Sequence, residues 1–266
     1  MKSYEIYDEE NSCQLGVLLY FEKIKKAIIE LDDNLNEWSS PLLFTSFVKE
    51  KVFTIPTDIS MLFIRERIIP SGRQNIQSIL SNHGLKEYDE IKFLELSEGR
   101  CSQDSLCIRK INELPQYVSD RQLHNVKEVA PLSNSSLLCV FFNDTIKLVS
   151  LETLSAAVSD VNKVLFNKPL YESVDLVAGG YGISFGDSIE VPAASLYKAG
   201  IEIPLSASDL MTFFNRNILD TSDCCNYLEC SRQNISYFTK DNRLTPIKND
   251  AKGNLYFRGQ VESLRW

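Results

Sequence analysis

Short apolar runs bounded by polar residues predict strands near the start of the chain, and a helical pattern follows. Tyr4–Tyr7, Val17–Phe21 and Ala27–Leu31 are short apolar runs of strand-like composition. Between Asn75 and Leu94 the apolar residues recur at helical spacing, and Asn82-His83-Gly84 interrupts the pattern. We therefore expect residues 1–120 to form a mixed α/β domain.

Two hairpins are predicted in the middle of the chain, where apolar runs flank turn-forming dipeptides. Their runs and turns are Leu137–Phe142, Asn143-Asp144 and Thr145–Val149 in the first, and Tyr181–Phe185, Gly186-Asp187 and Ser188–Val191 in the second. Pro192 then opens a short helix, Ala193–Lys198, which Gly200 ends. Residues 121–204 are expected to form a small α+β domain.

The remaining segment, residues 205–266, follows the junction Pro204-Leu205-Ser206. Ser208 can cap a helix whose apolar residues are Leu210, Met211, Phe213 and Phe214. The length of 266 residues allows two or three domains. The predicted fold class of the whole chain is α+β.

No apolar run approaches the roughly 18–20 residues that a membrane span needs. The N-terminus, Met1–Glu10, is polar and acidic and lacks the basic start of a secretory signal. The seven cysteines are odd in number and irregularly spaced, which favours reduced thiols. We therefore expect a cytoplasmic protein with no membrane partner.

Neither a metal site nor a cofactor site is predicted. The cysteines form no Cys-x-x-Cys pair, and the only histidines, His83 and His124, are far along the chain from Cys224, Cys225 and Cys230. The glycine-rich stretch Ala178–Gly182 precedes strand-like residues, whereas a phosphate cradle leads into a helix. We interpret that stretch as a turn between strands.

Charge is distributed unevenly along the chain, whose net charge is −8. From Ser231 to Trp266 there are seven basic and three acidic residues, a net +4, so the rest carries −12. A basic end on an acidic chain is typical of proteins that bind a polyanion.

A helix-turn-helix is predicted within this end of the chain. Asp220 or Thr221 can cap a short first helix, and the small residues Cys224 and Cys225 allow a second helix to approach it closely. A tight turn at Glu229-Cys230 follows.

The second helix is expected to begin after Ser231, a good N-cap, with Ile235 and Phe238 on its inner face. Its outer side chains suit DNA, because Arg pairs with guanine, Asn or Gln pairs with adenine, and Ser, Tyr and Lys reach phosphates. The predicted contacts in and before this helix are Ser231, Arg232, Gln233, Asn234, Ser236, Tyr237 and Lys240.

A wing is predicted after the second helix, as two short strands around the turn 249–253. Its basic residues are expected to lie beside the phosphate backbone. These candidate contacts are Arg243, Lys248, Lys252 and Arg258. Lys252→Ala is expected to weaken binding to all sequences alike.

The last fifty or so residues resemble the winged helix-turn-helix of excisionases and MerR-type regulators. The resemblance rests on the recognition-helix run Ser231–Ile235, the wing start Arg243–Pro246, and Phe257–Val261 at the start of a last helix. It implies binding of double-stranded DNA. Glu229 departs from the pattern, because the turn usually has glycine there, and it adds a negative charge.

The middle segment resembles domain of unknown function family 2442, a small α+β family often encoded beside toxin-like genes. The matching residues are Val140–Thr145, Leu165-Phe166, Pro169–Tyr171 and Ile189–Tyr197. The first segment is similar to the N-terminal subdomain of HipA-type toxin kinases, at Ile68–Arg73, Ile79-Leu80, Gly84-Leu85 and Leu94–Arg100. Ile69 and Ser71 depart from the HipA pattern, and the likeness implies a partner-binding or regulatory module without catalysis.

These observations predict a DNA-binding transcriptional regulator, an antitoxin or autorepressor, with a toxin as a candidate protein partner. We expect a homodimer, because one winged helix-turn-helix reads only a few base pairs. No catalytic residue is assigned. Two alternatives stay open: a protein-interaction module that neutralises a toxin without binding DNA, and an enzyme using Cys101 or Cys139, which would need a base such as histidine.

Overall fold

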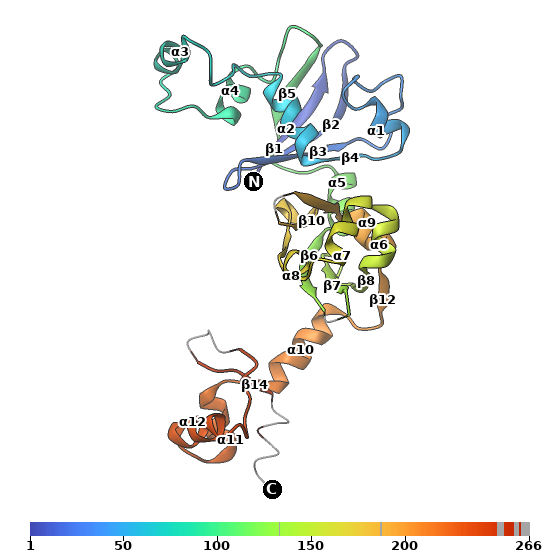
Figure 1. Cartoon of the computed structure of the whole chain (residues 1–266). Coiled ribbons are helices and arrows are strands. Elements are labelled where there is room, and N and C mark those ends of the chain that lie inside the picture. Colours follow the sequence, from blue (N-terminus) through green and yellow to red (C-terminus); the bar gives the residue numbers. More distant parts are fainter. Residues whose placement is uncertain (133, 187, 249–252, 258–260, 262–266) are drawn as a thin grey trace.

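The structure, a computed structural model, describes residues 1–132, 134–186, 188–248, 253–257 and 261. It belongs to the α+β class, as predicted. Figure 1 shows an N-terminal lobe (residues 1–112), a middle lobe (126–206) and a C-terminal lobe (218–261), in chain order from top to bottom. No helix of the described part is long and apolar enough to cross a membrane.

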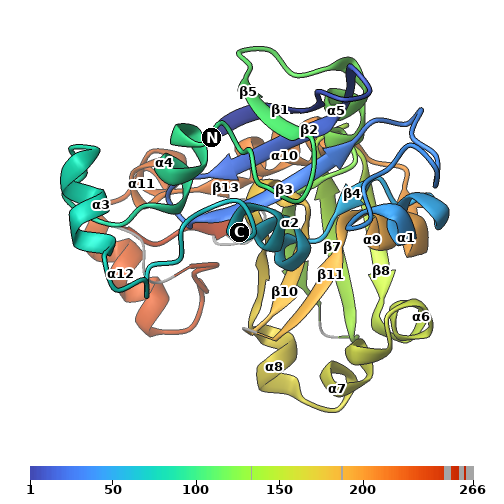
Figure 2. The same cartoon turned by 90° about the horizontal axis from the view of Figure 1, so that it is seen from above.

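The N-terminal lobe is built on a five-stranded antiparallel sheet in the order β4-β3-β2-β1-β5. Its strands are β1 (Lys2–Asp8), β2 (Cys13–Phe21), β3 (Lys26–Leu31), β4 (Thr54–Ile55) and β5 (Leu106–Lys110). Its helices are α1 (Thr45–Lys49), α2 (Thr57–Arg65), α3 (Ile76–Asn82) and α4 (Glu90–Leu96). The three predicted strands and the interrupted helical stretch are confirmed. Figure 2, the view from above, shows β1, β2 and β3 side by side.

Both faces of this sheet are covered, because side chains alternate between them along each strand. One face packs with α2 and α4 into a core that includes Leu18, Ile29 and Phe63. The opposite face, with Val17 and Leu19, packs against helix α5 (Gln116–Gln122) and against the middle lobe. The N-terminal and middle lobes therefore share one hydrophobic cluster.

The middle lobe contains two antiparallel sheets, in the orders β12-β8-β7-β6 and β11-β10-β9. The strands are β6 (Val126–Pro131), β7 (Ser136–Phe141), β8 (Ile146–Ser150), β9 (Val174–Leu176), β10 (Gly182–Phe185), β11 (Ile189–Pro192) and β12 (Ile201–Ile203). The helices are α6 (Leu151–Ala157), η1 (Ser159–Val161), α7 (Asn162–Leu165), α8 (Lys168–Glu172), η2 (Ala178–Gly180) and α9 (Ala193–Ala199). The pairs β7–β8 and β10–β11 confirm both predicted hairpins.

The glycine-rich stretch is a turn between β9 and β10, as predicted, and it brings the backbone close to β6. Gly180 has φ of 71°, in the left-handed region, and a Cβ there would lie 2.2 Å from the carbonyl oxygen of Val126. Only glycine fits this approach without displacing β6. The next residue, Tyr181, enters the cluster shared with the N-terminal lobe.

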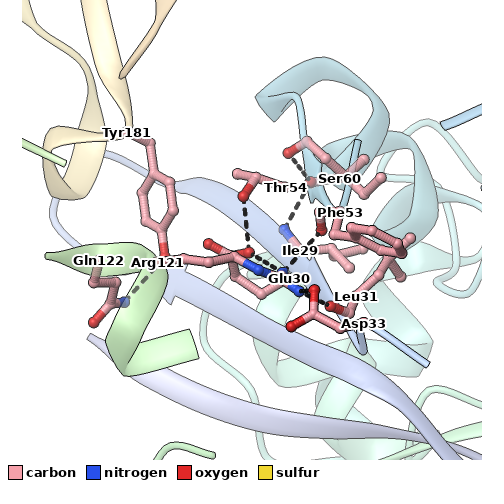
Figure 3. A network of polar contacts seen from close by, with 11 residues as sticks. Ile29, Glu30, Leu31, Asp33, Phe53, Thr54, Ser60, Arg121, Gln122 and Tyr181 are labelled. Carbon is pink, nitrogen blue, oxygen red and sulfur yellow. Dashed lines mark hydrogen bonds and ion pairs between the residues drawn. The ribbon is translucent and has the colours of Figure 1, made fainter. Parts of the chain in front are cut away.

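A buried ion pair joins α5 to the N-terminal sheet (Figure 3). The Glu30 side chain is fully buried, and its Oε2 accepts hydrogen bonds from Arg121 Nη1 at 2.7 Å and from Thr54 Oγ1 at 2.8 Å. Arg121 also donates to the Leu31 carbonyl at 2.8 Å and pairs with Asp33. These contacts satisfy much of the polar demand of a buried charge, which is what makes such a pair tolerable.

The C-terminal lobe follows helix α10 (Ala207–Asn217). Its elements are β13 (Ile218–Leu219), α11 (Thr221–Leu228), α12 (Arg232–Lys240) and β14 (Tyr256–Phe257), with β13 and β14 antiparallel. The predicted N-cap of α10 is wrong by two residues. Ser206 is the cap and accepts from the Asp209 amide at 3.0 Å, whereas the Ser208 hydroxyl donates to Asp144 at 2.7 Å.

One loop of the N-terminal lobe leaves large apolar side chains in solvent. Between β3 and α1, Trp38 is 90% exposed and Leu42 is 96% exposed. Tryptophan is enriched among the residues that contribute most to binding at protein interfaces.

Candidate nucleic-acid interface

Helix α11 begins at a capping box formed by two acidic residues. The Asp223 amide donates to Asp220 Oδ1 at 2.8 Å, and the Asp220 amide donates to Asp223 Oδ2 at 3.2 Å. Two amide groups that the helix leaves without partners are satisfied in this way. The predicted cap at Asp220 is confirmed.

The turn between the helices places Glu229 in the left-handed conformation, with φ of 51° and ψ of 42°. A residue with a side chain pays about 1–2 kcal/mol for this conformation, which explains why glycine is expected there. Ser231 then caps α12, accepting from the Asn234 amide at 3.4 Å. The cap expected at Ser231 is therefore confirmed.

A small core fixes the two helices against each other. It contains the fully or almost fully buried side chains of Cys224, Ile235, Leu244, Tyr256 and Val261. Ile235 points inward from the first turns of α12, as does Phe238 three residues later, whereas Asn234 and Ser236 beside Ile235 are exposed. The helix-turn-helix layout is thus built by a core of its own.

The outer face of α12 is open to solvent. All of its predicted DNA contacts are exposed: Arg232, Gln233, Asn234, Ser236, Tyr237 and Lys240. Figure 1 shows α11 and α12 at the far end of the molecule from the N-terminal lobe. In the described part of the chain, the acidic lobes therefore do not cover this face.

Two side-chain contacts within the lobe hold cationic residues in place. Arg232 Nη2 donates to the Ser222 hydroxyl on α11 at 3.0 Å. The guanidinium of Arg243 lies 4.8 Å from the centre of the Phe238 ring. The sequence predicted neither contact, because each joins residues on different elements. Both contacts limit the freedom of a cationic side chain on the surface of this lobe.

The wing is described in part. Lys248 and Leu255 form one antiparallel bridge, and the Ile247 amide donates to the Leu255 carbonyl at 2.6 Å. β14 follows Leu255 directly and pairs with β13. Two strands were expected around the turn, and the described residues show one strand after it, β14, and the single bridge between Lys248 and Leu255. Lys252 and Arg258, both predicted contacts, and most of the turn lie outside the described residues.

Basic residues predominate on the described α12 and wing arm. From Ser231 to Lys248 there are four basic residues and one acid, Asp241. The nearby acids Asp220, Asp223 and Glu229 belong to α11 and the turn. The lobe therefore has a cationic side, formed by α12 and the segment after it, beside an acidic first helix.

Two buried cysteines, Cys224 of this lobe and Cys139 of the middle lobe, are poor nucleophiles. Burial raises the pKa of Cys224 and that of Cys139 to about 12, which disfavours the reactive thiolate. The His124 ring contacts the Tyr197 ring at a tilt of 53°, with ring centres 4.4 Å apart. Within the described ranges, no group of three or more potential ligands is placed to hold a metal ion.

No family model matches the chain, and comparisons with curated proteins and with solved structures gave no match. The resemblances to excisionases, to family 2442 and to HipA thus stay predictions.

Proposed function

We propose that this protein is a sequence-specific, double-stranded-DNA-binding transcriptional regulator, and that it acts as an autorepressor or antitoxin. The proposed setting is the cytoplasm. The observation that carries the proposal is the exposed face of α12, where Arg232, Gln233 and Asn234 stand at the N-terminal end of a helix anchored from behind by Ile235. That end of a second helix normally meets the base edges.

The proposed mode of binding divides the contacts into two kinds. Arg232, Gln233 and Asn234 read bases in the major groove, and Ser236, Tyr237, Lys240, Arg243 and Lys248 hold the phosphates. Arg232 is the strongest candidate for guanine, because its contact with Ser222 limits the side chain to one direction. Lys240 carries a point charge at the end of the helix and has no part in base readout.

A selection of preferred sites from random duplex DNA, followed by binding measured at several salt concentrations, tests the proposal. Arg232→Ala should cost about 1–3 kcal/mol at one base position and relax the preference there. Lys240→Ala should weaken all sequences alike and reduce the salt slope by about one.

Lys163→Ala is the matched control, since Lys163 is an exposed lysine of the middle lobe that pairs with Asp160 at 2.7 Å. It should leave DNA binding unchanged. Absence of any binding by the parent chain at low salt would refute the proposal, because phosphate contacts strengthen as salt falls.

Binding of a partner protein is a second candidate function, supported by the exposed Trp38 and Leu42. The surrounding loop contains Asp32 and Glu37 and no basic residue, and its Asp33 pairs with Arg121, so a basic partner with an apolar pocket would fit it. Co-purification with the products of flanking genes tests this function. Retention by the parent, and loss in a Trp38→Ala, Leu42→Ala double variant that still binds DNA, would support it.

A further inference from the structure

Helix α10 runs from the middle lobe to the C-terminal lobe (Figure 1), and most of its residues are exposed. Residues at i, i+3, i+4 and i+7 share one face of a helix. In α10 these are Asp209, Thr212, Phe213 and Arg216, and all four are exposed, with Phe213 at 52%. We call this set the α10 stripe.

The opposite face fixes how the helix is turned. Ala207 and Leu210 pack against Val140 and Ile146 of the middle lobe. Because these contacts hold the N-terminal half of α10, the stripe cannot rotate inward without breaking them. Its exposure is therefore set by packing on the other side.

The stripe has exposed apolar surface and two charged residues, and the Asp209 carboxylate accepts a hydrogen bond from the Ser206 hydroxyl at 2.9 Å. Neither Asp209 nor Arg216 forms an ion pair with any residue that the structure describes. The Thr212 hydroxyl donates to the Ser208 carbonyl at 2.9 Å, which satisfies that hydroxyl within the helix. The stripe thus offers an aromatic ring and a threonine side chain between opposite charges.

The order of the stripe is self-complementary. Read in the reverse direction, an acid faces a base, and Phe213 faces Thr212. A second copy of the helix laid antiparallel therefore meets opposite charge at both ends, whereas a parallel copy meets like charge at both. Opposite charges across an interface fix its register, and like charges in contact oppose association.

We propose that the α10 stripe binds the same stripe of a second copy of this chain, antiparallel, about a two-fold axis that crosses between Thr212 and Phe213. Asp209 of each copy then pairs with Arg216 of the other. The inference rests on the proposed function, because a two-fold DNA site needs two reading helices related in this way. Antiparallel pairing places the two C-terminal lobes beyond opposite ends of the helix pair.

Charge-reversal variants test the register. Asp209→Arg alone and Arg216→Asp alone should each raise the dimer dissociation constant by about tenfold or more, because each brings like charges together twice. An equimolar mixture of the two variants restores opposite charges at both contacts and should form a heterodimer. Sedimentation equilibrium without DNA measures all three samples, and far-UV circular dichroism checks that each is folded.

Phe213→Ala and Met211→Ala form a matched pair for the apolar contact. Both residues lie on α10 and are about half exposed, 52% and 56%, but Met211 lies outside the stripe. Phe213→Ala should weaken the dimer, and Met211→Ala should leave it as in the parent.

A parent chain that is monomeric at high micromolar concentration would overturn the inference. So would a mixture of the two charge variants that stays monomeric, or an equal loss in the Met211 and Phe213 variants. Because these measurements contain no DNA, they are independent of whether the proposed function holds. A dimer that binds no DNA would refute the function and leave the interface standing.

Discussion

Glu229 adopts a left-handed backbone conformation in the turn between α11 and α12, where the sequence pattern favours glycine. Two effects of this residue can be separated, because its conformation acts on stability and its charge acts on DNA. The conformation strains any residue that has a Cβ, whatever its charge.

Glu229→Gly is expected to stabilise the C-terminal lobe by about 1 kcal/mol, because it relieves that strain. Glu229→Gln keeps the strain and removes the charge, so it should leave the free energy of unfolding nearly unchanged. Both variants should bind DNA more tightly than the parent at low salt. Urea titrations and DNA binding measure the two effects. Equal stabilisation by glycine and glutamine would contradict the conformational explanation.

Single-residue predictions succeeded where the chemistry was local. Ser231 was predicted as a cap and is one, and of the two caps predicted for α11, Asp220 and Thr221, the structure has Asp220, because a cap bonds an amide only three residues away. Ser206 was missed in favour of Ser208, although both fit the pattern. The choice depends on Asp144, which binds the Ser208 hydroxyl from a distant hairpin. Because Asp144 is distant along the chain, the sequence around the two serines does not indicate which of them caps the helix.

The contact between α5 and strand β3 depends on the pair of Arg121 and Glu30. Burial raises the pKa of Glu30, although hydrogen bonds from Arg121 and Thr54 act in the opposite direction. The carboxyl is therefore poorly solvated and relies on the guanidinium. Removing one partner should lower the free energy of unfolding more than removing both, because the remaining partner is then a buried charge without an opposite charge beside it.

Arg121→Met should lower the free energy of unfolding by about 3–5 kcal/mol at neutral pH. A Glu30→Leu, Arg121→Met double variant should lose less of the free energy of unfolding than the Arg121→Met variant does. In the single variant the pKa of Glu30 is higher when folded than when unfolded, so stability relative to the parent should recover as pH falls through the folded value. Urea unfolding at pH 7 and pH 5 measures both effects. A loss that grows toward pH 5, or a double variant worse than the single one, would contradict the prediction.

At the scale of elements, the sequence predicted what local spacing determines. The hairpins β7–β8 and β10–β11 were found from the residues in their turns, and the helix-turn-helix from its caps and apolar spacing. The pairing of β13 with β14 was not predicted, because Ile218 meets Phe257 across the whole helical unit. β4 was missed because two residues, Thr54-Ile55, are too short to show an alternating pattern.

At the scale of the whole molecule, the N-terminal and middle lobes share a hydrophobic cluster, whereas the C-terminal lobe has a separate core. Tyr181 of the middle lobe packs with Val17 and Leu19 of the N-terminal sheet, so these lobes share a cluster. The C-terminal lobe has its own core around Ile235, and α10 connects it to the rest of the chain. Segments that share a hydrophobic core tend to unfold together. We therefore expect the N-terminal and middle lobes to unfold as one unit and the C-terminal lobe to unfold separately.

Calorimetry of the parent chain should therefore show two transitions. Ile235→Ala should cost about 2–5 kcal/mol in the C-terminal transition and leave the other in place. Leu18→Ala, in the core of the N-terminal lobe, should move only the other transition. One transition that both variants shift together would show that the lobes unfold as a unit.

Trp38, which is 90% exposed in the loop of the N-terminal lobe, has a spectroscopic consequence. Water surrounds its indole in the folded chain almost as it would in the unfolded one. In a Trp266→Phe background its fluorescence emission should hardly change on denaturation, so it is a poor optical probe of folding. A protein that covers the loop would exclude that water and shift the emission toward the blue, which makes the same indole a built-in sensor of docking.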